Sequence, residues 1–540
     1  IQVTNTGEYA GKDVVQLYCT APYTTGGIEK AQVVLVGFAK TPMLWPADEA
    51  NDSDRPQSAV VSIEFSPYSI ASYDDSDANG NGFRGYELEG GSYSLSLRTD
   101  AHTPKVGVDA ISFEVLTGGV RYDEDPVTKQ PVINRFEDAD EQLDTVLSRA
   151  DWAATWPTQP NGHALNTYSY SSSDFADITP NNPNEYTEIP AMGAEVTISL
   201  VEMMGKPYDD ADWDLILDAL TIDDMKSLFN NGAFQTSAVD KIGKPATIES
   251  DGPVGFTNFI SDENIYGTVA YASEVVIGST WSIEMLEGFG NSVGEEGIWC
   301  KQRENPAIPY SGWYAPGINI HRSPFGGRNF EYFSEDGFLS GKLAAAQVRG
   351  ALEKGVYTFM KHFALNEQET NRDNNGSSSW ATEQAMRELY FKPFEIAVKD
   401  GGATGVMSSF NRIGTRWTGG DYRLLTEVLR GEWGFRGTVI CDFNMYAYMN
   451  NRQMAYAGGD LNLRTTKAPW ASADANSAAD VTVLRNAAHN ILYTVVNSNA
   501  MNGIEKDTVL TTGMAPWQLI MIIVDVGVLI ALAVWGFFSI

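Results

Sequence analysis

The sequence predicts a multidomain protein with an N-terminal β-sandwich, a (β/α)8 barrel of the TIM type after it, and a transmembrane helix at the C-terminus. Three patterns predict this: short alternating strands in residues 1–118, apolar runs that alternate with helical stretches over residues 211–497, and a long apolar run in residues 517–538. The length of 540 residues exceeds the size at which a single hydrophobic core stops growing.

The first region reads as a set of half-buried strands. In residues 93–98, Tyr, Leu and Leu alternate with Ser, Ser and Arg, as in strands with one face on a core. Turn-forming residues at 5–7 and 90–91 separate such stretches. Many short strands with glycine-rich turns and no long helical period predict a small β-sandwich over residues 1–118.

Residues 119–210 are acidic and rich in Pro, Asn and Ser, which indicates a long connector. The aromatic side chains of Phe136, Trp152 and Trp156 need apolar surroundings. We therefore expect the connector to wrap over a domain.

Residues 211–497 contain short apolar runs that each close on a polar residue, with helical stretches between them. The runs are Thr247–Ser250, Val356–Met360, Gly405–Met407 and Thr438–Cys441. One helix is expected around residues 386–397, with a kink at Pro393. Alternating strands and helices over this length predict a (β/α)8 barrel, in which residues at the strand ends converge on one mouth.

The C-terminal run from Leu519 to Phe538 is long enough to cross a bilayer, and Trp517 and Trp535 lie near its ends. Asp525 within the run is costly in hydrocarbon, so a buried terminal helix stays open as an alternative. The prediction is a cell-membrane anchor, and the run has no flanking cluster of Lys or Arg that would set its orientation.

The composition excludes some partners. The net charge of −33 opposes binding to nucleic acid or to an anionic lipid surface, whereas a neutral sugar meets no such penalty. Cys19, Cys300 and Cys441 lie far apart and fit no metal-ligand spacing. We expect no metal and no organic cofactor.

Polar residues at the predicted strand ends form the candidate site. Asp251, Lys361, His362 and Asp442 each follow or close an apolar run, and Arg328 lies in a glycine-rich turn. Singly, each has a structural explanation, such as a turn cap, a local ion pair or a core histidine. Their shared position at strand ends favours a common site.

Four segments of the second region resemble glycoside hydrolase family 3, and they occur in the expected order. They include Lys361-His362-Phe363 and Cys441-Asp442-Phe443, and they span residues 319–336, 361–372, 387–394 and 434–443. The segment Asp251-Gly252-Pro253 resembles a fifth family motif. Residues 1–118 look like the fibronectin type III-like domain that many members carry.

The resemblance implies the roles of the site residues. Asp442 matches the family nucleophile, and the sugar-binding positions match Asp251, Arg328, Lys361 and His362. The implied reaction is an exo-acting, retaining double displacement on an oligosaccharide or glycoside, most plausibly a β-glucoside. Asp442 must be ionised, and we expect the cations of Lys361 and Arg328 to favour that form.

The sequence departs from the family in its general acid. In most members that acid is a Glu in a separate α/β sandwich domain, which is expected here upstream of Ile1. A branch acting on N-acetylglucosamine carries a His and an Asp after Lys-His-Phe instead, whereas this chain has Asn366–Glu369. Glu367 or Glu369 as a local acid is less favoured than a loop-stabilising role.

Two further positions leave alternatives open. Phe410 stands where the family often has Tyr, so transglycosylase or phosphorylase activity on the same scaffold is left as an open alternative. Asp75 to Gly80 begins like an EF-hand loop, but its twelfth position is Tyr86, so a solvated turn is favoured. The alternative from another class is a membrane-anchored carbohydrate-binding protein or fragment without the general acid.

Overall fold

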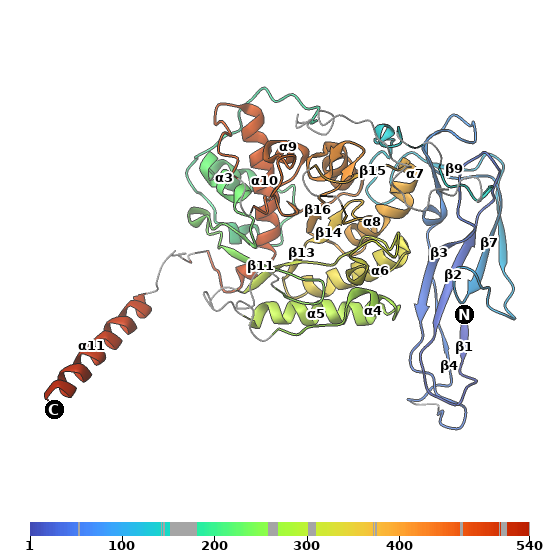
Figure 1. Ribbon diagram of the computed structural model, residues 1–540, viewed down its shortest axis with the longest axis horizontal. Coiled ribbons are helices and arrows are strands. Elements are labelled where there is room, and N and C mark those ends of the chain that lie inside the picture. The colour runs from blue at the N-terminus through green and yellow to red at the C-terminus, as the bar shows by residue number, and fades with distance from the viewer. Residues whose placement is uncertain are drawn as a thin grey trace.

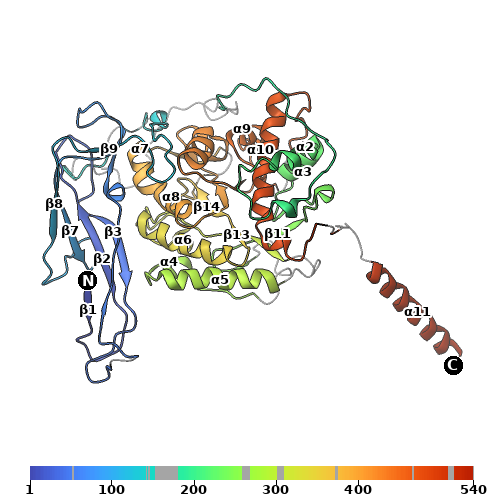
Figure 2. The same ribbon diagram turned by 180° about the vertical axis from the view of Figure 1, so that it is seen from behind.

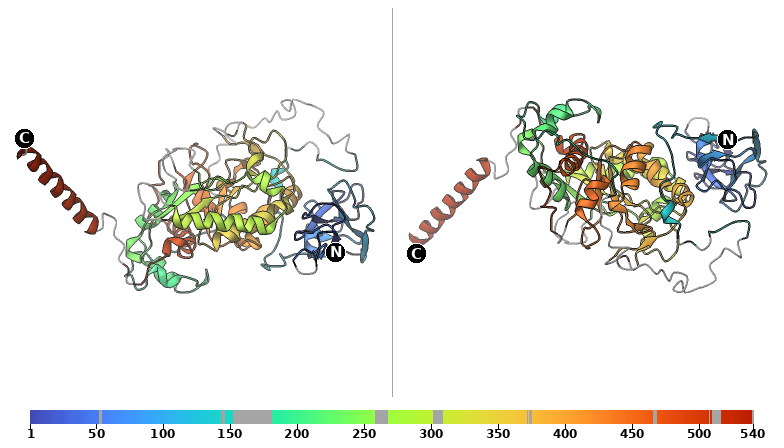
Figure 3. Two further views of the ribbon diagram at one scale, coloured as in Figure 1. Left: turned by 90° about the horizontal axis from the view of Figure 1, so that it is seen from below. Right: turned by 90° about the horizontal axis from the view of Figure 1, so that it is seen from above.

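The structure is a computed structural model. It describes residues 1–51, 54–141, 143, 146–151, 181–257, 268–300, 309–370, 372, 375–464, 468–506, 508 and 516–538. Figures 1 and 2 show an N-terminal β region beside a larger α/β region, with α11 (Pro516–Phe538) clear of both. In Figure 3 the two regions lie side by side along the long axis of the molecule.

The β region consists of antiparallel strands in two main sheets. One sheet has the order β3-β2-β7-β8, the other has the order β5-β6-β9, and β1 pairs with β4. The elements are β1 (Gln2–Thr4), β2 (Val14–Thr20), β3 (Val34–Lys40), β4 (Ser58–Val60), η1 (Pro67–Ile70), β5 (Ser72–Asp74), β6 (Gly85–Leu88), β7 (Gly91–Arg98), β8 (Ile111–Val115) and β9 (Val120–Tyr122). The third strand of the smaller sheet lies past residue 118, so the predicted boundary is too early. That the domain is of the fibronectin type III kind stays a prediction.

The α/β region contains the remaining elements. They are η2 (Glu137–Ala139), η3 (Leu200–Met203), α2 (Trp213–Ala219), α3 (Ile222–Asn230), β10 (Gln235–Thr236), η4 (Asp240–Ile242), β11 (Thr247–Asp251), α4 (Glu274–Gly278), α5 (Ile283–Trp299), β12 (Tyr310–Tyr314), η5 (Asn329–Glu331), α6 (Gly337–Leu352), β13 (Tyr357–Thr358), β14 (Met360–Phe363), β15 (Ser378–Ser379), α7 (Glu383–Ala385), η6 (Met386–Tyr390), α8 (Lys392–Lys399), β16 (Gly405–Ser408), β17 (Arg412–Ile413), β18 (Arg416–Trp417), η7 (Thr418–Gly420), η8 (Arg423–Glu432), β19 (Thr438–Cys441), α9 (Asn451–Ala457), α10 (Ala478–Val496) and η9 (Asn499–Met501).

Backbone hydrogen bonds close a ring at the centre of this region. Parallel pairing joins β11 to β12, β12 to β13, β14 to β16 and β16 to β19. A parallel bridge between Gly317 and Lys361 continues the series from β12 to β14, and another joins Ile440 to Leu461. The ring closes where the Gly232 amide donates to the Asn462 carbonyl, 3.1 Å away, and the Glu249 amide donates to the Phe234 carbonyl at 2.8 Å.

This ring differs from the predicted all-parallel, eight-stranded barrel. Its described segments are 229–236, β11, β12, β13 with β14, β16, β19 and 461–464, and β10 runs antiparallel to β11. Apolar runs in a sequence report burial but not strand direction, so the antiparallel first segment could not be predicted. The four predicted runs do form β11, β13 with β14, β16 and β19.

The helix expected around residues 386–397 is divided in two. A π-helical turn, η6, follows α7, and α8 begins at Lys392 with Pro393 in its first turn. Proline suits that position because the first helical amides have no acceptor within the helix. The expected kink at Pro393 is therefore a helix start.

The described part of the connector packs against the α/β region. Phe136 is buried and meets Phe391 edge to face, with ring centroids 5.7 Å apart. The amides of Arg135 and Phe136 both donate to Glu383 Oε2, at 2.7 and 2.8 Å. Leu200 and other residues before 211 already belong to the core of the α/β region, so that boundary is also too late. Trp152 and Trp156 lie outside the described residues.

The C-terminal helix α11 carries the run Leu519–Phe538, with a mean hydropathy of 2.6 and no part of it buried against the protein. Within the described residues it is the one helix long and apolar enough to cross a membrane.

Candidate active site

The end of β11 and the strand β14 bring Asp251 and Lys361 together. The Lys361 Nζ atom donates to Asp251 Oδ1 at 2.7 Å, and the Gly252 amide donates to the same oxygen at 2.8 Å. The Lys361 side chain is 4% exposed, so this ion pair is shielded from water. Asp251 Oδ2 remains a second acceptor on the same carboxylate.

His362, the next residue on β14, is held by Arg328 and Asn319. Arg328 Nη1 lies 3.0 Å from His362 Nε2. Since a guanidinium can only donate, Nε2 accepts and the ring proton of a neutral imidazole lies on Nδ1. Burial first, and then the charge of Arg328, lower the pKa of His362 well below its usual range. Asn319 Oδ1 accepts from the His362 amide at 2.7 Å, and its Nδ2 donates to the His362 carbonyl at 3.0 Å.

Asp442 directly follows β19 and lies against His362. Its Oδ2 atom is 3.6 Å from His362 Nε2, and its Oδ1 accepts from the Phe443 amide at 2.8 Å. Burial raises the pKa of the Asp442 carboxyl above its usual range, and three cations oppose that rise: Arg372, Arg328 and Lys361. The expected help from Lys361 and Arg328 is therefore present, but burial outweighs it.

Arg372 is a functional candidate that the sequence did not single out, and its partner is Glu369, which was weighed there as a less favoured local acid. Two ion pairs join them: Arg372 Nη1 is 3.2 Å from Glu369 Oε1, and Arg372 Nη2 is 2.8 Å from Glu369 Oε2. The Arg372 guanidinium also lies 4.5 Å from the centre of the Phe410 ring. Both residues belong to the segment 361–372, but nothing in their spacing shows that the loop returns to Asp442. The ring of Phe410 thus supports a cation beside the site.

The carboxylates nearest these cations are all engaged by protein donors. Glu331 is in an ion pair with Arg328 Nε, and Glu369 Oε1 lies 3.7 Å from Arg328 Nη1. Asn319 Nδ2 lies 3.2 Å from Glu367 Oε1. Burial raises the pKa of Glu367 to about 7 and also raises that of Glu369. The local ion pair expected for Arg328 and its place in the site are therefore both present.

The structure brings all five predicted side chains into one cluster. Asp442 is surrounded by Lys361, which pairs with the Asp251 carboxylate, by the two further cations Arg328 and Arg372, and by the neutral imidazole of His362. Hydrogen-bond acceptors and donors therefore alternate over a short distance. Such a set matches a neutral ligand with many hydroxyl groups, and a carboxylate in it can act as a nucleophile when ionised.

The loop that begins like an EF-hand is used for contacts within the protein. Asp75 Oδ2 accepts from the Gln384 amide at 3.0 Å, which joins the β region to α7. Asp77 Oδ1 accepts from the Gly82 amide at 2.9 Å. Across the described part of the chain, no three His, Cys, Asp or Glu side chains converge in a way that could hold a metal ion.

Comparison with known proteins places this cluster in a family. The profile of the Glycosyl hydrolase family 3 N terminal domain matches residues 222–468. Beta-glucosidase A of Butyrivibrio fibrisolvens is 30% identical over 486 residues, which cover 86% of this chain and 53% of that protein. A beta-glucosidase of Ruminococcus albus is 32% identical over 474 residues, covering 84% of this chain and 44% of the relative.

The solved structure of a beta-glucosidase from Paenibacillus barengoltzii matches with a TM-score of 0.67 at 26% identity, over 95% of this chain and 54% of that one. The chain thus spans about half the length of the relatives it matches. The cluster lies almost entirely within the matched residues, which carry its strands, its turn and its loop. Residues 222–468 of this chain therefore belong to glycosyl hydrolase family 3.

Proposed function

We propose that this chain is the sugar-holding and nucleophilic part of an exo-acting, retaining β-glucosidase. The observation that carries the proposal is the position of Asp442 among Arg372, Arg328 and Lys361, all of which favour its ionised form. The beta-glucosidase names of the two bacterial relatives support the choice of substrate.

The proposed reaction has two displacements. An oxygen of ionised Asp442 forms a bond to the anomeric carbon while the bond from that carbon to the leaving oxygen breaks, and the leaving oxygen takes up a proton. Water then attacks the same carbon and gives a proton back to the group that protonated the leaving oxygen, while the bond to Asp442 breaks and the carboxylate is restored. The sugar leaves with its original configuration. Asp251 accepts from sugar hydroxyls, Lys361 and Arg328 donate to sugar oxygens, and neutral His362, whose Nε2 faces Asp442, is the fourth sugar-binding candidate.

The source of the proton for the leaving group is proposed from the family resemblance. The described carboxylates beside Asp442 already accept from arginine or asparagine side chains. Ion pairing makes Glu331 and Glu369 poor proton donors, and Glu367, whose pKa burial raises to about 7, is held by Asn319. An upstream α/β sandwich domain that donates this proton stays a prediction.

A fluorinated substrate tests the nucleophile directly. A 2-deoxy-2-fluoro-β-glucoside with a dinitrophenolate leaving group needs little acid assistance, so labelling does not depend on the source of the proton. We expect one equivalent of dinitrophenolate to be released and the fluorosugar to be found on Asp442 by mass spectrometry of peptides. Binding of the sugar without an adduct on Asp442 would contradict the proposed role.

The same labelling experiment distinguishes the glycosidase from the second candidate function, a carbohydrate-binding protein. The raised pKa of buried Asp442 and the engaged carboxylates around it are the observations that favour this candidate. A chain that binds the glucoside reversibly and releases no dinitrophenolate would support binding without catalysis.

Arg372 is expected to determine the pH below which kcat/KM falls, the acid limb of the pH profile. Among the cations that oppose the effect of burial on Asp442, Arg372 acts most strongly. Removing it in Arg372→Met should raise the pKa of Asp442 further, so protonation would inactivate the nucleophile at a higher pH. The acid limb of kcat/KM for 2,4-dinitrophenyl β-glucoside should therefore move to higher pH.

Arg452→Met is the matched control for this prediction. Arg452 is half exposed, lies 3.6 Å from Asp480 and is not among the groups that act on Asp442. Its removal should leave the acid limb in place. An acid limb that stays the same in Arg372→Met, or moves to lower pH, would show that Arg372 does not act on the nucleophile.

We further propose that α11 anchors the chain in a cell membrane with the catalytic region outside. Its apolar run of spanning length supports the anchor, and a substrate found outside cells supports the orientation. We expect the full chain to stay with the membrane fraction after carbonate extraction and the α/β region to be removed by protease added to intact cells. Release by carbonate or protection from protease would contradict the anchor or the orientation, respectively.

A further inference from the structure

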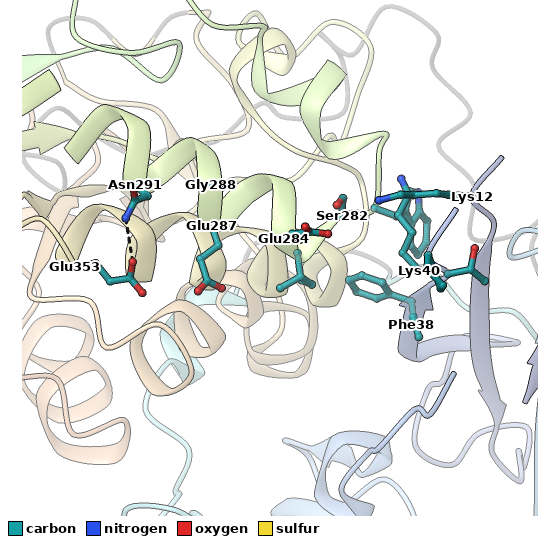
Figure 4. Close-up of a pocket in the computed structure, with 14 residues that line it drawn as sticks. Lys12, Phe38, Lys40, Ser282, Glu284, Glu287, Gly288, Asn291 and Glu353 are labelled. Carbon is teal, nitrogen blue, oxygen red and sulfur yellow. Dashed lines mark hydrogen bonds between the residues drawn. The ribbon is translucent and has the colours of Figure 1, made fainter. Parts of the chain in front are cut away.

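A cavity that Asp442 does not line lies between the β region and α5. It has a volume of about 760 Å³. Lys12, Phe38 and Lys40 line it on the β side, and Glu284, Glu287 and Asn291 line it on the α5 side (Figure 4). We call it the α5 cleft. A volume of this size falls within the range of small-molecule sites, about 300 to 1,000 Å³.

One face of α5 forms the floor of the α5 cleft. Glu284, Glu287, Gly288 and Asn291 recur three and four residues apart, so their side chains share one face of the helix. At Gly288 an added Cβ atom would meet nothing within 4 Å. Glycine in mid-helix is unfavourable compared with alanine, and here it leaves a flat, open place between polar side chains.

The two walls of the α5 cleft carry opposite charges. Lys12 is exposed on the β side and Glu284 is exposed on α5. Glu287 Oε2 lies 3.2 Å from Arg349 Nη2, and Asn291 Nδ2 donates to Glu353 Oε2 at 3.0 Å (Figure 4). A charged ligand of either sign would therefore meet a like charge on one wall. A neutral ligand with both donors and acceptors would be satisfied by both walls.

Aromatic rings supply the apolar part of the α5 cleft. Phe38 and Trp281 meet edge to face with centroids 5.3 Å apart, and both line the cavity. The flat apolar faces of such rings pack well against the C–H groups of sugar rings. The Lys40 ammonium is bound to the Thr280 carbonyl, which ties β3 to the start of α5 and holds the two walls together.

From this combination we propose that the α5 cleft is a second saccharide-binding site, separate from the cluster around Asp442. Its ligand is a neutral, hydroxyl-rich oligosaccharide segment, with a sugar ring above Gly288 and hydroxyls shared between Lys12, Glu284 and Asn291. The choice of a glucose oligomer as the probe rests on the proposed function, but the class of ligand rests on the cleft alone.

Filling the α5 cleft at Gly288 tests the proposal. The background chain carries Asp251→Asn and Asp442→Asn, which weaken binding at the catalytic cluster. Cellotetraose is titrated and observed by saturation-transfer NMR, and a diazirine derivative of cellotetraose is crosslinked and mapped by mass spectrometry. Gly288→Gln places a long side chain in the cleft and favours the helix, so the fold should persist, as a thermal melt will check.

The background chain is expected to bind cellotetraose, and Gly288→Gln is expected to weaken that binding by about tenfold or more. Crosslinks should fall on residues 283–299 and be lost in the variant. Met285→Gln is the matched control, because Met285 is exposed on the same helix and does not line the cavity. It should leave both the binding and the crosslinks unchanged.

Undiminished binding in Gly288→Gln, or crosslinks that avoid α5, would overturn the proposal. So would a background chain that binds no cellotetraose. Failure of the fluorosugar to label Asp442 would instead overturn the proposed function, and it leaves the result at Gly288 unaffected. The two ideas can therefore fail separately.

Discussion

Asp442→Gly is expected to lower the hydrolysis of 2,4-dinitrophenyl β-glucoside by roughly 10⁴- to 10⁶-fold, the range of losses seen when one catalytic residue of an enzyme with a covalent intermediate is deleted. The neighbouring cations and His362 remain in the variant, but they only donate hydrogen bonds or charge and form no bond to carbon. A good leaving group makes this substrate insensitive to the general acid, so the loss reports on the nucleophile. Release of dinitrophenolate is followed by absorbance.

A small anion offers a sharp control for this variant. Azide can enter the space left by the Asp442 carboxylate, where Arg372 and Arg328 attract an anion. It should attack the anomeric carbon, restore part of the rate, and give the α-glucosyl azide. An unchanged rate in Asp442→Gly, or rescue with formation of the β-azide, would contradict a nucleophilic role for Asp442.

Arg387→Met is expected to lower the free energy of unfolding by about 3–5 kcal/mol, because it leaves buried carboxylates without their main partner. The Arg387 side chain is 3% exposed. Its Nε donates to Glu383 Oε1 at 2.8 Å, its Nη1 donates to Glu432 Oε2 at 2.7 Å, and its Nη2 donates to the Ile133 carbonyl at 2.9 Å. The guanidinium also lies 4.8 Å from the centre of the Tyr73 ring of β5.

The cluster around Arg387 therefore joins the β region, the connector and the α/β region. Denaturant unfolding of Arg387→Met measures the loss. Lys105→Met is the control, since the pair of Lys105 and Asp13, 3.3 Å apart, is 42% and 53% exposed and should contribute within about 1 kcal/mol. Equal effects of the two substitutions would show that the buried network does not hold these parts together.

Several elements were predictable because one local pattern carries them. The four apolar runs before polar residues all form strands of the ring, since burial in a ring requires apolar side chains. β12 (Tyr310–Tyr314) was missed, because its aromatic and glycine residues show neither alternation nor a continuous aliphatic run. The antiparallel β10 was missed because two residues give no pattern at all.

Only some residues of the candidate site could be predicted from the sequence. Asp251, Lys361, His362 and Asp442 were found from their position after apolar runs, and the structure places them together. Arg372 and Asn319 were not found, because they reach the site through loops whose path depends on contacts with distant residues. The sequence shows that Phe410 lacks the hydroxyl of a Tyr, and the structure adds that its ring lies 4.5 Å from the Arg372 guanidinium.

The sequence by itself determined the family of residues 222–468, the strand-end residues of the site and the apolar helix near the C-terminus, because each is written in a continuous stretch of chain. The tertiary structure alone decided the protonation of His362, the balance of burial against cations at Asp442, and the α5 cleft between β3 and α5. Those properties depend on distances between segments far apart in the chain, and both Coulomb and desolvation energies change steeply with such distances.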